Sequence, residues 1–246
     1  MPTIDFATVP SGVIISDERI NFLNARAAET HAAFTRRIQS LMEKFAEARD
    51  NYSREADSLV GDETDPATRA TAKQFARRRL LTQLSKYRQA LIEASAKDRS
   101  AMLAQLKAFA DEAQATGAVL ASPAAMLGRV ALGDPRKTQL IEQLTGAGPM
   151  ELETAARTAI MSGDLVLASA LALVVDRKPR DARPFRAGDL ALRVMGDQFK
   201  DVSDKLHAVL MAYKTAQAAD LEFIRGKPDP ITNISLALGG LAEAQT

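Results

Sequence analysis

Apolar side chains recur at alternating steps of four and three residues over the first quarter of the chain, and this spacing constrains the fold more than any other feature. It places them in one narrow stripe along a helix, as at the seam of a coiled coil. A helix of roughly 44 residues would be about 66 Å long, and it needs a partner because it cannot cover its own stripe. The stripe consists of Ile20, Ala27, His31, Phe34, Ile38, Leu41, Phe45, Ala48, Tyr52, Glu55 and Leu59.

A second long helix is expected from Pro66 to about Thr116, where Gly117 would close it. Asp65 before it is a typical N-cap, followed by proline at the first helical position. Only a five-residue connector, 61–65, separates the two long helices. They are therefore expected to fold back on each other as an antiparallel hairpin.

The stripe of the second helix keeps the same spacing but slips between Asp98 and Met102, where two steps of four follow each other. Such a stutter locally relaxes a supercoil. The stripe consists of Leu80, Leu84, Tyr87, Leu91, Ala94, Asp98, Met102, Leu106, Phe109 and Ala113. Basic residues early in this helix should face acidic residues of the first helix and help to set the register. The basic residues are Lys73, Arg77, Arg78 and Arg79, and the acidic ones are Glu47, Asp50 and Glu55.

Proline and glycine recur at short intervals between residues 118 and 185, so shorter elements are expected there. Each Ser-Pro, Asp-Pro or Gly-Pro pair is typical of a cap followed by proline at the first helical position. The pattern predicts four short helices, near 123–132, 135–145, 149–162 and 164–177. A third long helix follows and ends at Gly226. Its stripe is Val202, Leu206, Val209, Tyr213, Ala216, Asp220 and Phe223.

These elements predict an all-α fold: a long, coiled-coil-like antiparallel hairpin, a short-helix region and a third long helix, with extended N- and C-terminal arms. The low aromatic content of 5% and the absence of Trp favour long helices in close contact over a sheet sandwich. The predicted segments are an N-terminal arm (1–15), the hairpin (16–117), the short-helix region with an arginine-rich connector (118–185), the third helix (186–226) and a C-terminal tail (227–246).

The sequence predicts no catalytic, cofactor-binding or metal-binding residues, and we therefore expect a protein that is not an enzyme and needs no cofactor. It has no cysteine and only two histidines. His31 lies in the first stripe, where a packed polar residue that sets register is the simplest interpretation. His207 lies beside its stripe and is expected to face solvent. Neither phosphate-binding loops nor hydrolase motifs occur. A di-iron bundle is rejected because the nearest match to its Glu-x-x-His motif is Asp204…His207, on one helix only.

A basic connector between the short helices and the third long helix is the first candidate contact site. Arginine side chains in a proline-stiffened loop suit phosphates or an acidic partner surface, although an ordinary solvated or interface loop is the expected role. The candidate phosphate or partner contacts are Arg177, Lys178, Arg180, Arg183 and Arg186.

The C-terminal tail is the second candidate, because it carries more apolar side chains than a solvated tail should. It is expected either to dock on this molecule or to bind a neighbouring one. The candidate interface residues are Ile231, Ile234, Leu236, Leu238 and Leu241.

We expect a non-enzymatic structural or assembly protein that acts through helical surfaces, in a homo-oligomer or a larger assembly. Abundant alanine, arginine in preference to lysine and an arm at each end are typical of bacterial and phage chains, which favours a subunit of a phage virion or another large particle. The alternative is a nucleic-acid-associated protein that uses the basic connector, although a net charge of +1 provides no global attraction. Without a visible signal peptide or membrane span, the expected location is the cytoplasm or a virion particle.

Overall fold

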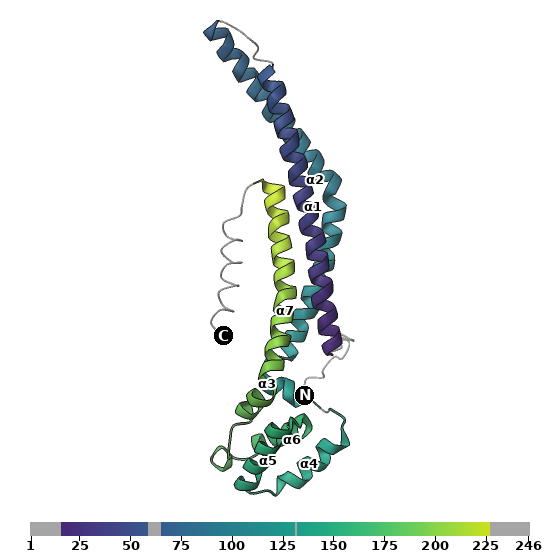
Figure 1. Cartoon of the computed structure of the whole chain (residues 1–246), viewed down its shortest axis with the longest axis vertical. Coiled ribbons are helices and arrows are strands. Elements are labelled where there is room, and N and C mark those ends of the chain that lie inside the picture. The colour runs from purple at the N-terminus through teal and green to yellow at the C-terminus, as the bar shows by residue number, and fades with distance from the viewer. Residues whose placement is uncertain (1–15, 59–64, 131, 227–246) are drawn as a thin grey trace, which may run out of the picture. The chain divides into compact units, whose positions relative to one another are not determined.

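The computed structural model describes residues 16–58, 65–130 and 132–226, which form seven α-helices and one short 3-10 turn without any strand (Figure 1). The predicted all-α fold class is confirmed. The predicted arms, 1–15 and 227–246, lie outside the described residues. The chain divides into two compact units, each assembled from separate stretches. Unit 1 comprises Met1–Asn24 and Asp111–Ala208, and unit 2 comprises Ala25–Ala110 and Val209–Thr246.

Helices α1 (Asp17–Ser58) and α2 (Pro66–Val119) form the predicted hairpin in unit 2. Arg37 of α1 pairs with Asp98 of α2 at 3.1 Å, and farther along α1 Glu55 pairs with Arg79 at 3.0 Å. The partner's number falls as the number in α1 rises, so the two helices are antiparallel. The second pair confirms the predicted facing of basic and acidic residues for Arg79 and Glu55.

The predicted seam of α1 is buried over most of its length. Phe34 is fully buried, and its neighbours in unit 2 that share the stripe are also buried: Ala27, Ile38 and Leu41. Burying a side chain as large as phenylalanine stabilises a fold by about 1.5–3 kcal/mol. Toward the end of α1 the stripe is only half-buried at Phe45 and Tyr52, and Glu55 is exposed. Helix packing in unit 2 is therefore tightest away from the hairpin turn.

The buried face of α2 differs from the predicted stripe near the stutter. Ala94 and Asp98 are exposed, whereas Ser95 and Arg99 are buried. The predicted stripe followed apolar residues only, so it missed that the buried face includes the charged residue Arg99. The helix also continues past Gly117 to Val119, since that glycine does not have the left-handed conformation of a helix end.

Helix α7 (Ala187–Arg225) contributes its C-terminal part to unit 2, where it packs on α1 and α2. Val209 and Ala216 of its predicted stripe are buried there. The helix ends as predicted at Gly226, which has a φ of 75°. The N–H of Gly226 donates to the carbonyl of Glu222 at 2.7 Å and closes the last turn.

Unit 1 contains the predicted short helices α3 (Pro123–Arg129), α4 (Pro135–Thr145), α5 (Pro149–Ser162) and α6 (Leu165–Arg177). Helix α3 ends three residues earlier than predicted. Helix α6 packs against α3, α4 and α5, and small buried residues such as Ala168 and Ala170 let the helices approach closely. Within the described ranges, no helix has the length and apolar character that crossing a membrane requires.

Side-chain caps fix the starts of three helices in unit 1, and two of these caps, Ser122 and Asp134, were predicted. Side-chain oxygens of Ser122 and Asp134 accept hydrogen bonds from N–H groups in the first turns of α3 and α4. The carboxylate of Asp164 accepts from the N–H groups of Leu167 and Val166 at 3.1 and 3.0 Å. The bond from Leu167 is the main reason that the pKa of Asp164 lies below its ordinary value.

Candidate functional site

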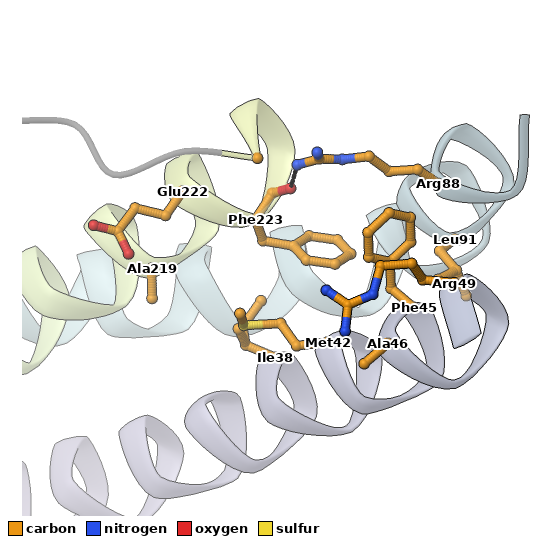
Figure 2. Close-up of a pocket in the computed structure, with 11 residues that line it drawn as sticks. Ile38, Met42, Phe45, Ala46, Arg49, Arg88, Leu91, Ala219, Glu222 and Phe223 are labelled. Carbon is orange, nitrogen blue, oxygen red and sulfur yellow. Dashed lines mark hydrogen bonds between the residues drawn. The ribbon is translucent and has the colours of Figure 1, made fainter. Parts of the chain in front are cut away.

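An apolar groove of about 430 Å³ lies in unit 2 where the last turns of α7 meet α1 and α2 (Figure 2). Ile38 forms part of its buried wall, whereas Met42, one turn farther along α1, is 59% exposed. Such a recess suits apolar side chains better than a polar ligand. The lining residues are Ile38, Met42, Phe45, Ala46, Arg49, Arg88, Leu91, Ala219, Glu222, Phe223 and Gly226.

Arg88 of α2 ties the end of α7 to the groove. Its Nη2 donates to the carbonyl oxygen of Phe223 at 2.5 Å, and its guanidinium lies 5.8 Å from the ring centroid of Phe45 (Figure 2). A cation is favourable at the carbonyl end of a helix and over an aromatic face. A Cβ atom at Gly226 would collide with this guanidinium, so the glycine leaves room for it.

A buried ion pair holds α2 and α7 together in unit 2. The guanidinium of Arg99 contacts the carboxylate of Asp220, and the two side chains are only 4% and 13% exposed. The Nε of Arg99 also donates to the hydroxyl of Ser95 at 3.0 Å, and its Nη2 donates to the carbonyl of Ile92 at 3.1 Å. Its guanidinium lies 5.2 Å from the ring centroid of Phe223. These contacts satisfy a charge that would be costly to bury alone.

Sequence reasoning missed Arg99 but placed its partner on a stripe. Asp220 interrupts the apolar stripe of the third helix, and a carboxylate at such a position needs a buried cation. The stutter between Asp98 and Met102 marked the matching place in α2. The acidic residue in one stripe and the stutter in the other could together have indicated the ion pair of Arg99 and Asp220.

The predicted basic connector forms a closed loop between α6 and α7 in unit 1, with a 3-10 turn at Arg180–Ala182. The Nη2 of Arg183 donates to the carbonyl of Asp176 at 2.6 Å, and its Nε donates to the carbonyl of Lys178 at 2.8 Å. The ammonium of Lys178 in turn donates to the carbonyl of Ala147 at 3.1 Å. Two of the five candidate cations thus hold the loop in shape.

The other three candidate cations of the connector, Arg177, Arg180 and Arg186, are exposed. The chain therefore presents them on a loop that Arg183 fixes. The candidate interface residues of the tail (Ile231, Ile234, Leu236, Leu238 and Leu241) lie outside the described residues.

The two histidines are both half-buried. His31 keeps its predicted place in the seam, but the expectation that His207 faces solvent is wrong. The Nε2 atom of His207 is buried, although part of the residue remains accessible to solvent. Over residues 16–58, 65–130 and 132–226, no three acidic or histidine side chains gather so that they could hold a metal ion.

Another cation of unit 1 is committed to the fold. The ammonium of Lys137 donates to the carbonyls of Gly128 and Val130 at 3.1 and 3.2 Å, which satisfies the C-terminal end of α3. Burial lowers the pKa of Lys137 below its ordinary value.

Comparison with known proteins finds no family model, no curated protein and no solved structure that matches this chain.

Proposed function

We propose that this chain is a non-enzymatic structural or assembly protein that acts through its helical surfaces. Its specific form would be a subunit of a phage virion or of another large particle, bound to further copies of itself or to other subunits. The support comes from the hairpin and from the way in which the chain uses its charged side chains.

The part of the hairpin beyond the end of α7 carries the proposal. We call residues 52–58 and 66–87 the hairpin projection; in unit 2 this end of the hairpin extends past the last turn of α7 (Figure 1). An edge-to-face contact of Tyr52 and Tyr87, with centroids 6.3 Å apart, lies at its base. Phe75 and Leu81 on α2 are 62% and 59% exposed. We infer that these two side chains contact a partner, because no third helix of the described residues covers this part of the hairpin (Figure 1).

Two arginines of unit 2 that hold helices together support a non-enzymatic role. Arg88 bonds a helix carbonyl and Arg99 pairs with Asp220, so both guanidinium groups hold helices in place. A general acid or base must lie within hydrogen-bond reach of its substrate, whereas these two groups are bonded to another helix. Both side chains hold α7 against α2 within the chain.

The test is self-association, followed by sedimentation velocity over a range of concentrations. We expect oligomers of the unmodified chain, and expect Phe75→Lys with Leu81→Lys to dissociate them because the added charges oppose burial of the projection. Gln74→Lys with Thr82→Lys adds the same charge at exposed neighbouring positions and should leave the oligomers intact. A monomer at the highest attainable concentration would contradict self-assembly, and equal loss in both variants would contradict a specific role of Phe75 and Leu81.

Nucleic-acid binding is the second candidate function, supported by the exposed Arg177, Arg180 and Arg186 on the fixed loop. Replacing these three with serine should abolish retention on DNA or RNA and flatten its salt dependence. A matched control replaces Arg36, Arg69 and Arg78, which are exposed elsewhere, and so removes the same charge. Absence of retention by the unmodified chain at about 50 mM salt would exclude this function.

A further inference from the structure

We propose that the apolar groove of unit 2 is the docking site of the chain's own C-terminal segment, residues 231–241. This inference goes beyond the proposed function, because it concerns contact within one molecule and would hold whether or not the chain assembles with others.

The chain leaves α7 at the groove itself. Gly226 is both the last described residue and part of the groove lining, and its φ of 75° turns the backbone out of the helix. In the sequence, four residues (227–230) separate Gly226 from Ile231. Connections between packed helices are commonly two to eight residues long, so this length allows the chain to return along α7.

The dimensions of the groove also fit the segment. The lining residues of α7 extend from Gly226 back to Ala219, which corresponds to about 10 Å along a helix. Four extended residues span about 13 Å. The segment can therefore reach the far end of the groove without distorting α7.

Four of the five candidate interface residues, all except Leu236, have the spacing of an amphipathic helix. Ile231, Ile234, Leu238 and Leu241 follow one another at steps of three, four and three residues. A helix would carry all four on one face, which is the pattern of amphipathic helices that bind in grooves. Met42, which is exposed at the groove, would be covered by them.

The same chain is favoured over a second copy as the source of the segment. A short connector raises the effective concentration of a tethered segment to the millimolar range. A segment from another molecule would have to compete with one that begins at the groove lining. Intramolecular docking is therefore the expected arrangement at ordinary protein concentrations.

The experiment uses the full chain with Ile234→Trp, because the natural sequence has no tryptophan and the new side chain is then the only indole. We expect a blue-shifted emission maximum that does not change on dilution. Ala46→Arg in the groove wall should move the maximum toward that of solvated tryptophan. Ala32→Arg at an exposed position of the same helix should leave it shifted. Met42→Lys is a second groove variant at an exposed position that the fold should tolerate, and circular dichroism checks that all variants keep their helicity.

Three outcomes would overturn the proposal. Emission typical of solvated tryptophan in the otherwise unmodified chain would show that the segment does not dock. A blue shift that survives both groove variants would place the segment elsewhere. A shift that disappears on dilution, together with a change in mass by light scattering, would show that a second copy supplies the segment. None of these results decides whether the hairpin projection mediates assembly, so the two proposals can fail separately.

Discussion

Arg99 and Asp220 form an ion pair between α2 and α7 that is almost fully removed from solvent. The two residues lie 121 positions apart in the sequence. Ser95 and the carbonyl of Ile92 share the hydrogen bonds of the guanidinium, so the pair belongs to a satisfied polar network inside an apolar bundle. Its geometry fixes how α7 lies against α2 within unit 2.

Replacing Asp220 with alanine should cost about 3–5 kcal/mol of unfolding free energy, because it leaves the charge of Arg99 buried without a counterion. Asp98→Ala is the matched control: Asp98 is 60% exposed and pairs with Arg37 on the surface of the same unit. Exposed pairs contribute about 0–1 kcal/mol. Urea denaturation followed by circular dichroism measures both values.

The double variant Arg99→Met with Asp220→Leu tests the cause of that loss. It removes both charges, so it should recover most of the stability lost in Asp220→Ala. A double variant as unstable as the single one would show that packing, rather than the unpaired charge, is responsible.

The seam should be far less tolerant at Phe34 than at Phe45. Phe34 is fully buried, and Phe34→Ala should cost about 3–5 kcal/mol. Phe45 is half-buried beside the groove, so Phe45→Ala should cost less. Ile38→Ala, at a buried position, should cost about 2–5 kcal/mol. Equal losses at Phe34 and Phe45 in thermal melts would mean that the groove is closed in solution.

Gly226 and Arg88 should be energetically coupled. Gly226→Ala places a Cβ where the guanidinium lies and strains a backbone with positive φ, so we expect a loss of about 1 kcal/mol. In a chain that already carries Arg88→Ala, only the backbone strain remains and the loss should shrink. A double-mutant cycle measures the difference. Strict additivity would show that Arg88 moves aside at no cost.

Acid should selectively weaken the start of α6. The pKa of Asp164 is lowered in the folded chain, so the stability from its charge is present above the ordinary pKa of about 3.8 and is lost as the pH falls through the folded value. Asp164→Asn keeps a cap but removes the charge. Its loss of unfolding free energy relative to the natural chain should therefore be largest near neutral pH and should disappear on acidification. Asp164→Ala also removes the cap, which costs about 1 kcal/mol, and should retain part of its deficit in acid. A deficit of Asp164→Asn that is constant with pH would contradict this role.

The connector should depend on Arg183 and not on Arg180. Arg183 donates to two backbone carbonyls, so Arg183→Ser should lower the melting temperature. Arg180→Ser removes the same charge from an exposed position and should leave the melting temperature almost unchanged. Similar effects of the two changes would argue against a structural role for Arg183.

Local signals predicted most of the fold. Pro123, Pro135 and Pro149 each begin a helix, as the sequence indicated, because their caps act within a few residues. The buried face of α2 was misplaced at Asp98 because interior position 99 is charged, and a count of apolar residues cannot recognise a charged interior position. Arg99 can be buried there because it pairs with Asp220, which comes from α7, much later in the chain.

The candidate site was less predictable for the same reason. The groove is made by three helices whose meeting point depends on where α7 ends, and only the end at Gly226 was evident from sequence. In the basic connector the composition was evident, but not the difference between Arg183, which holds the loop, and Arg180, which is exposed. Only the folded backbone shows which carbonyls a guanidinium can reach.

The separation between Arg99 and Asp220 has a consequence for synthesis on the ribosome. Translation at about 5–20 residues per second delivers Asp220 roughly 6–24 seconds after Arg99. During that interval the face of α2 that α7 will cover is without its final neighbour. We expect the charge of Arg99 to keep this uncovered face of α2 hydrated and so to lower its tendency to aggregate with other nascent chains. The guanidinium of Arg99, which pairs with Asp220 in the folded chain, would thus also limit aggregation before α7 is synthesised.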